Sequence, residues 1–377
     1  MRSPDFYSSD EFFLPQSLID DILKHSDKIR DEIESVHEHL AEIKDHAREK
    51  LAELGLLKTF EDSGLKPANT CGIDGSYVIE SLLSIDVVCA AAVGIEGQPP
   101  YGKSPVIWDK PHHDISLICL PHSELNSTVA RSIMVMKEIK LAANAPHDVV
   151  LLDGSAFTPV AAVASVMKYL DRLIHTDAFS LVMDEYSTFR KAFRKVILRT
   201  EDDDHIYAFM AKYVTSKLLT KKLLNADLDI DDRAFSTIIL KENEYIVMPQ
   251  FKVPGGHIVK TPTGESDPYD EVLSSIRTVY YRPGKELPAM KVEIPEKILS
   301  DPIKFSFLLE SIASQCFSAS ILEPYPLFLA DQFAKNMKEG VKISRESATL
   351  RNRTRSLLTD LEVFMNFYSY RTSTGVE

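Results

Sequence analysis

The chain has 377 residues, of which 44% are hydrophobic and 26% charged, the composition of a globular protein with one large domain or two ordinary ones. Residues 1–5 lack the apolar core of a signal peptide, and the longest apolar stretch, residues 87–95, is too short to cross a bilayer. The four cysteines are far apart and form no CxxC pair, which argues against a structural zinc site and a disulfide framework. These features predict a cytoplasmic protein without a membrane span.

The net charge of −13 argues against unaided, tight binding to nucleic acid, because phosphates attract basic surfaces. Much of the excess is local, since residues 1–66 contain nine basic and sixteen acidic side chains. Residues 335–355 have the opposite balance, with seven Lys and Arg against two Glu. This balance of charges does not exclude an enzyme that binds DNA through metal ions and one basic face.

The N-terminal part of the chain is predicted to form one long helix, residues 16–54. Apolar residues recur there in steps of three and four, with charged residues between them. Such a stripe packs either on its own domain or against a second helix, which can belong to the same chain or to a partner. The sequence leaves these alternatives open.

A β-rich region follows a connector that contains Gly64. Three strands are predicted at residues 70–79, 84–95 and 114–119, followed by a helix from Ser123 to about residue 145 and a strand at 148–152. A helical region then reaches about residue 200. Later strands are expected at 206–214, 244–249, 277–282 and 290–294, and later helices at 302–318, 326–338 and 344–368. The predicted organisation is a helical segment (1–66), an α/β domain (67–340) and a helical tail (341–377).

Two apolar, strand-like runs in this region end in the same three residues, Asp-Gly-Ser, at positions 74–76 and 153–155. Each run places a carboxylate at the end of a strand, just before a glycine, the residue that best tolerates a sharp turn. Carboxylates are rarely buried unless they are paired or bound to a metal. Asp74 and Asp153 are therefore predicted to meet around a divalent cation.

A third acid is predicted from helical spacing. The residues three and four positions from Glu138 are all apolar, so its carboxylate is expected on the inward face, with Lys137 and Lys140 on the polar side. Burial would penalise this charge unless a cation compensates it. Glu138 is accordingly predicted as a metal ligand. The alternative is a boundary glutamate whose stem packs while its head reaches water.

Three such acids suit the hydrolysis of a phosphodiester bond. Two metal ions about 4 Å apart can stabilise both the attacking and the leaving oxygen. Hard ions such as Mg²⁺ and Mn²⁺ prefer oxygen ligands. We expect Asp74 to bridge a two-metal site that Asp153 and Glu138 complete.

The predicted elements follow the order of a ribonuclease H-like domain: three strands, a helix, and then a strand that ends on an acid. With both Asp-Gly-Ser runs, Glu138, Tyr325-Pro326 and Leu329-Ala330-Asp331, the chain resembles the NurA nuclease family over residues 68–340. The resemblance implies a ribonuclease H-like α/β fold, in which a mixed sheet is flanked by helices. It also implies a manganese-dependent DNA nuclease that acts as a 5′-to-3′ exonuclease and a single-strand endonuclease. The resemblance further implies a homodimer whose partner is a HerA-type hexameric ATPase. The two proteins would act together in DNA end processing or anti-phage defence.

One position departs from the family. Archaeal members carry a catalytic histidine where this chain has Asp331. An aspartate can ligate a metal but cannot act as a histidine proton shuttle. By resemblance Asp331 is included among the catalytic residues, and a plain helix-surface aspartate is the alternative.

Three further residues are predicted to contact DNA. Lys217 follows a strand and resembles a family position, while Tyr281 and Arg282 could stack on a base and hold a phosphate. The alternatives are a strand-end lysine and the ordinary packing of aromatic residues in a strand.

The sequence thus predicts a metal-dependent DNA nuclease. A second hypothesis is a non-catalytic assembly subunit that only caps the ATPase ring. A third keeps the fold but changes the substrate to RNA or branched DNA. No Walker-type loop is present in the sequence, so ATP hydrolysis would belong to a partner.

Overall fold

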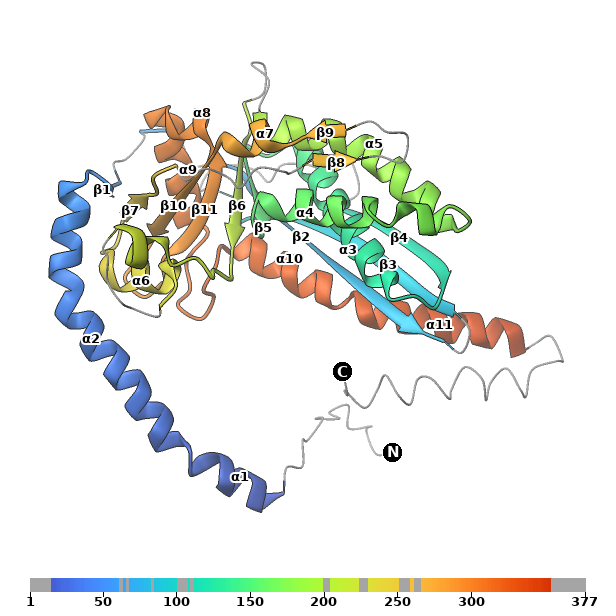
Figure 1. Cartoon of the computed structure of the whole chain (residues 1–377), viewed down its shortest axis with the longest axis horizontal. Helices are drawn as coiled ribbons and strands as arrows, with labels where there is room; N and C mark the ends of the chain where they lie inside the picture. Colours follow the sequence, from blue (N-terminus) through green and yellow to red (C-terminus); the bar gives the residue numbers. More distant parts are fainter. Residues whose placement is uncertain are drawn as a thin grey trace, which may run out of the picture.

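The structure, a computed structural model, describes residues 15–60, 64–65, 68–82, 85–99, 108, 112–198, 204–223, 230–250, 258–260 and 266–353. Most of the predicted C-terminal tail therefore lies outside the described residues. The chain folds around one nine-stranded sheet with helices on both faces (Figure 1). This architecture confirms the predicted α/β class.

The order of strands in the large sheet is β1-β7-β10-β11-β6-β5-β2-β3-β4. Its members are β1 (Leu57–Thr59), β2 (Thr70–Ser81), β3 (Ile85–Glu96), β4 (His113–Pro121), β5 (Val149–Asp153), β6 (Ile206–Ala211), β7 (Glu244–Val247), β10 (Ile276–Arg282) and β11 (Met290–Pro295). The short strands β8 (Ile258–Lys260) and β9 (Ser266–Pro268) form a separate pair.

The centre of the sheet has the predicted ribonuclease H-like arrangement. β2, β3 and β4 form an antiparallel meander, after which helix α3 (Leu125–Asn144) leads to β5, which joins the other side of β2 in parallel. β6 continues the sheet in parallel with β5. Residues 149–152 of β5 are all buried, as expected for a parallel strand covered on both faces.

Helices cover the two faces of the sheet in separate sets. One apolar core lies under α3, α4 (Phe157–Met167) and α5 (Asp177–Leu198), and the other lies under α8 (Glu296–Leu299), α9 (Pro302–Ser314) and the start of α10 (Tyr325–Lys335). The remaining helical elements are η1 (Leu170–Leu173), η2 (Leu219–Leu223), α6 (Asp232–Ile239), α7 (Asp270–Ser274) and α11 (Met337–Arg353). No described helix is long and apolar enough to span a membrane.

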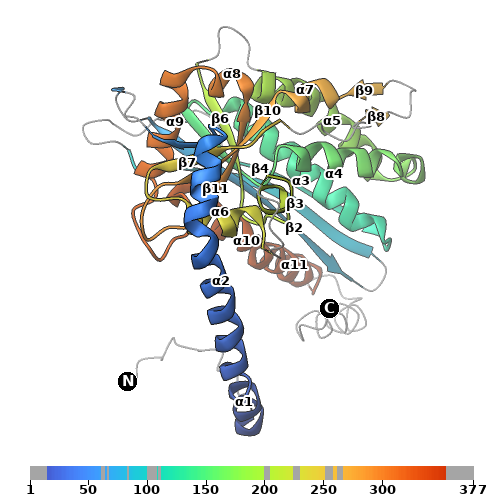
Figure 2. The same ribbon diagram turned by 60° about the vertical axis from the view of Figure 1, so that its left-hand side comes forward.

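The predicted N-terminal helix forms two helices, α1 (Gln16–Leu23) and α2 (Ser26–Glu53), and projects from the body of the molecule (Figure 2). Among the described residues, the C-terminal end of this helix is the part that packs on the domain. Ala47 and Leu51 are buried in a small core with residues of α6, and the Arg48 guanidinium pairs with Glu244 at 2.7 Å. The free end of this helix is therefore available for a partner.

The prediction that Lys137 lies on the polar side of α3 is wrong. Lys137 is 1% exposed, and its ammonium contacts Asp114 Oδ1 at 2.6 Å and Glu185 Oε1 at 2.7 Å. These partners come from β4 and α5, so the ion pairs fasten both elements to α3. Spacing along one helix could not reveal this, because a second layer of helix covers the side that would otherwise face water.

Replacement of Lys137 by alanine would leave two carboxylates without their buried partner. We expect Lys137→Ala to lower the free energy of unfolding by about 3–5 kcal/mol in urea denaturation. Lys140→Ala is the matched control, because that side chain is more exposed and contacts the same two acids. Equal losses in the two variants would contradict the role assigned to the buried ammonium.

Candidate metal centre

Two adjacent parallel strands bring Asp74 and Asp153 together. In the pairing of β2 with β5, Ile73 lies opposite Leu152, so each aspartate is the next residue on its strand. The carboxylates of Asp74 and Asp153 accept hydrogen bonds from the N–H groups of the glycines that follow them.

The two Asp-Gly-Ser runs are not equivalent in structure. Gly154 has a φ of 90°, a conformation that favours glycine, and it ends β5. Gly75, by contrast, lies inside β2, which continues to Ser81. The expectation that both runs end a strand is therefore wrong for the first run.

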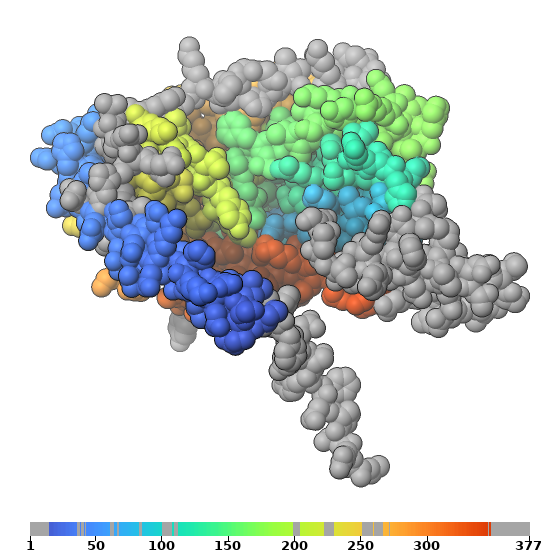
Figure 3. Space-filling model, turned by 60° about the horizontal axis from the view of Figure 1, so that its bottom comes forward, coloured from blue at the N-terminus to red at the C-terminus, as the bar shows by residue number. Residues whose placement is uncertain are grey.

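Asp331 supplies the third carboxylate, from α10. Ligand oxygens of Asp74, Asp153 and Asp331 all lie within 4.8 Å of one another. α10 can approach β2 this closely because residue 72 is glycine, where a Cβ would come within 2.5 Å of the Leu327 nitrogen. Figure 3 turns this side of the molecule forward and shows α10 as the red surface beside the cyan strands.

A lysine that the sequence analysis missed stands among these acids. Lys212 Nζ lies 3.2 Å from Asp153 Oδ2, 3.5 Å from Asp331 Oδ1 and 3.1 Å from Glu323 Oε2. Its main-chain carbonyl accepts a hydrogen bond from the Arg233 guanidinium, which holds the segment after β6 in place. The ammonium thus supplies part of the positive charge that the cluster requires.

The pKa values of the cluster reflect burial and mutual repulsion. Burial, followed by the charge of Asp153, raises the pKa of Asp74 to about 7. Burial also raises the pKa of Asp153, although Lys212 opposes it. At Asp331 the effect of burial is outweighed by Lys335 and Lys212, so its pKa is lowered. Asp74 and Asp153 thus resist ionisation beside the ionised Asp331, and a divalent ion would favour the charged form of all three acids.

Glu138 approaches the centre but is not one of the three mutually close carboxylates. It lies beneath Gly75 on the α3 side of β2, where any side chain at position 75 would collide with its Oε1 atom. Because successive residues of a strand point to opposite faces, Asp74 faces α10 while Gly75 faces α3. Burial and the charges of Asp74 and Asp153 raise the pKa of Glu138 well above its ordinary value. Of the predicted ligand set, the structure therefore gathers Asp74 and Asp153 with Asp331, and keeps Glu138 at the margin.

Glu293 supports the centre from β11. Its side chain is 2% exposed and accepts hydrogen bonds from the Ser155 hydroxyl and the Ala156 N–H, both at 2.8 Å. These bonds fix the turn that follows Asp153. The serine of the second Asp-Gly-Ser run is thus structural.

The residues predicted to contact DNA have other roles. Tyr281 is fully buried and packs against Phe60, so its assignment to base stacking is wrong for this conformation. The Arg282 guanidinium donates to four main-chain carbonyls, including those of Thr237 and Leu240, and its assignment to a phosphate is likewise unsupported. Lys217 lies in the segment between β6 and η2, outside the acidic cluster, and its role in DNA binding remains a prediction.

A sequence signal for Lys212 was available. Lys212 directly follows the buried strand β6, and Asp153 is the last residue of β5, the parallel strand beside it. The carboxyl ends of parallel strands meet at one edge of a sheet. Glu293 and Glu323 gave no such signal, because antiparallel strands and loops bring them to the centre from distant parts of the chain.

A mixed sheet whose central parallel strands gather carboxylates at one edge defines a ribonuclease H-like protein. The sequence profile of the NurA domain matches residues 68–335. The chain belongs to the NurA nuclease family.

Solved structures agree with this fold. The crystal structure of the NurA nuclease from Sulfolobus solfataricus is 13% identical with a TM-score of 0.57, and the match covers 90% of this chain and 98% of that chain. A crystal structure of NurA with manganese is 11% identical with a TM-score of 0.50, and the match covers 86% of this chain and 98% of that chain. No curated protein sequence matches the chain.

The raised pKa of Asp74 predicts how the metal-free protein responds to pH. Between about pH 4 and pH 7 the unfolded state loses the Asp74 proton while the folded state retains it, so the free energy of unfolding falls as pH rises. Each pH unit costs up to about 1.4 kcal/mol from this group, and Glu138 acts in the same direction.

Urea denaturation in EDTA across this interval measures the slope. Asp74→Asn should flatten the slope and stabilise the metal-free protein at pH 8. The exposed Asp171→Asn serves as the control. An unchanged slope in Asp74→Asn would show that its carboxyl group titrates normally.

Proposed function

We propose that this protein is a metal-dependent DNA nuclease that hydrolyses phosphodiester bonds at the cluster of Asp74, Asp153 and Asp331. The observation that supports it most directly is the approach of three carboxylates to within 4.8 Å in a member of a nuclease family. Mn²⁺ or Mg²⁺ suits these ligands, because hard ions prefer carboxylate oxygens. Manganese is also present in one of the similar structures.

Each residue of the centre has a distinct role in this proposal. Asp74, Asp153 and Asp331 would hold the ion, and Glu138, at the margin of the cluster, is kept as a candidate ligand of a second ion. Bound divalent ions supply charge stabilisation and water activation in phosphodiester hydrolysis. Lys212 would release the acids as the ion enters and would pair with a phosphate of the strand.

The finer assignments rest on family resemblance. These are 5′-to-3′ exonuclease and single-strand endonuclease activity, a HerA-type hexameric ATPase as partner, and a role in DNA end processing or anti-phage defence. The net charge of −13 favours a partner, because a translocase that holds DNA would supply the affinity that an acidic protein lacks. A non-catalytic subunit that caps the ATPase ring remains the alternative function.

Removal of one cluster carboxylate separates these two functions. We expect Asp153→Asn to slow Mn²⁺-dependent cleavage of linear DNA at least about 100-fold, since even residues that only orient metal ligands contribute 10- to 100-fold. It should also lose most of the Mn²⁺-induced rise in Tm.

Asp171→Asn, at an exposed position on η1, is the control and should behave as wild type. Cleavage that survives in Asp153→Asn would remove the catalytic assignment. A wild-type protein without metal-dependent cleavage, even with its ATPase, would favour the assembly subunit.

We also infer that the projecting N-terminal helix joins two copies of the chain. Its apolar residues follow a heptad pattern, with positions 22, 29 and 36 in one row and 33 and 40 in the other, ahead of Ile43 and Ala47, which pack on the chain's own core. Ile22, Ile29 and Ile33 are each more than half exposed. A two-stranded coiled coil would cover this seam.

Charges placed in the seam should break such a dimer. We expect Ile29→Glu combined with Ile33→Glu to convert a dimer into a monomer in light scattering, with the unfolding transition of the domain unchanged because both side chains are exposed. Lys28→Glu, on the polar side of α2, is the matched control. A dimer that persists in the double variant would place the interface elsewhere.

A further inference from the structure

A row of lysines follows the metal centre along α10 and α11. Four side chains are spaced in steps of four, three and four residues and so share one face of a helix: Asp331, Lys335, Lys338 and Lys342. We propose that the three lysines bind the backbone phosphates of one DNA strand and align this strand with the acids. The proposal rests on the nuclease function proposed above, and it gives a role to part of the basic segment at residues 335–355.

The two helices continue one another through Asn336, the residue between them. Asn336 has helical dihedral angles, with φ of −69° and ψ of −8°, and its N–H donates to the carbonyl of Gln332, four residues earlier. α10 and α11 accordingly lie in line (Figure 1). With a rise of about 1.5 Å per residue, the three lysines lie about 6, 10 and 16 Å beyond Asp331 along the axis. That length corresponds to about five phosphates of a stacked strand, in which they are about 3.4 Å apart.

The row faces the side of β2 on which β5 lies. Asp331 approaches Asp153 of β5, whereas Met337, about 120° around the helix from Asp331, contacts Cys89 of β3 through their sulfur atoms at 3.5 Å. Beyond residue 73, no described strand pairs with β2 on the side of β5. The row therefore lies beside an edge of β2 that no described strand covers, and this edge begins at the acids.

The ammonium groups of the row are accessible to a phosphate. All three lysines are exposed, and Lys338 forms no ion pair with a described residue. Lys335 Nζ lies 2.7 Å from Asp331 Oδ2, and Lys342 Nζ lies 3.9 Å from Glu339 Oε2. The two lysine side chains in these pairs are 68% and 56% exposed. Exposed pairs within one helix are weak, so a phosphate can replace either acid.

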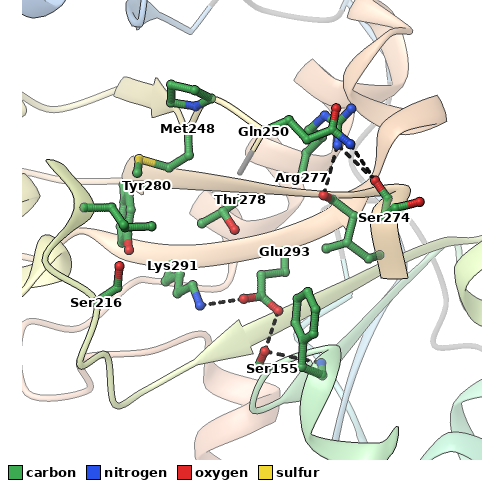
Figure 4. A pocket seen from close by; sticks show the side chains of 14 residues that line it. Ser155, Ser216, Met248, Gln250, Ser274, Arg277, Thr278, Tyr280, Lys291 and Glu293 are labelled. Carbon is green, nitrogen blue, oxygen red and sulfur yellow. Dashed lines mark hydrogen bonds and ion pairs between the residues drawn. The ribbon is translucent and has the colours of Figure 1, made fainter. Parts of the chain in front are cut away.

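Other cations around the centre are less accessible. Lys291, which lines a cavity on the α4 face of the sheet, lies 2.5 Å from Glu293 Oε1 (Figure 4). Arg277, in the same cavity, pairs with Glu296, and Lys212 is held by the acids of the centre. Each of these three cations is less than a quarter exposed. The row can thus set the direction of the strand, while most of the affinity comes from bound ions and a partner.

The first test measures binding in EDTA, so that it does not depend on cleavage. Fluorescence anisotropy of a labelled thymidine oligonucleotide of about 16 residues gives the affinity between about 50 and 200 mM NaCl. We expect Lys338→Gln combined with Lys342→Gln to weaken binding at about 50 mM NaCl at least about tenfold. The slope of log K against log[NaCl] should become shallower by about 1.4, because each phosphate contact on a single strand contributes about 0.7.

The matched control removes two lysines from another face of the molecule. Lys168→Gln combined with Lys191→Gln changes exposed positions at the end of α4 and on α5, alters the net charge equally and should bind as wild type. Three results would each overturn the proposal. They are a wild-type slope in the variant of the row, an equal loss of affinity in the control, and no salt-dependent binding by the wild type at about 50 mM NaCl.

A second test compares substrates of different length in Mn²⁺. The variant of Lys338 and Lys342 should raise the KM for the oligonucleotide at least about tenfold. It should cut a thymidine dinucleotide as the wild type does, because so short a substrate bound at the acids does not reach lysines about 10 and 16 Å away. Equal losses on both substrates would reject the placement of the strand along the row. A wild type that binds through these lysines but shows no metal-dependent cleavage would reject the nuclease function instead.

Discussion

Mutual repulsion among three carboxylates is the constraint on which the centre depends. Asp74, Asp153 and Asp331 approach within 4.8 Å, an arrangement that burial makes more costly still. The fold tolerates it because Lys212 contacts two of the three and because protonation relieves Asp74. An arrangement that costs stability in the absence of an ion is ready to bind one, since the ion relieves the repulsion.

The close packing around β2 is what makes this geometry possible. Gly72 admits α10 on one face of the strand, and Gly75 admits the Glu138 side chain on the other. A methyl group at position 72 would meet the main chain of α10 and push this helix, with its Asp331, away from the strand, whereas one at position 75 would displace the end of the Glu138 side chain. Gly72 therefore sets the distance between β2 and a helix from a distant part of the chain, and stability and function share the same contacts.

The distribution of charge is consistent with the proposal that a partner supplies the affinity for DNA. Lys212 contributes a positive charge within the centre, and its ammonium is held by Asp153, Asp331 and Glu323. Under the proposed function, the affinity for DNA phosphates would come from bound ions and from a partner.

The sequence by itself determined the α/β class, the central strands, the helix between them and the importance of Asp74 and Asp153, because strand and helix periodicities and the two Asp-Gly-Ser runs are local signals. Only the tertiary structure decided that Asp331 joins them, that Lys212 lies among the acids, and that Lys137 and Tyr281 are buried. Those outcomes depend on which layers cover a helix or strand, and on contacts between different elements, such as those of Lys137 with β4 and α5 and of Asp331 with Asp74 and Asp153. Spacing within one element reports the face on which a residue lies; it carries no information about what the rest of the chain places on that face.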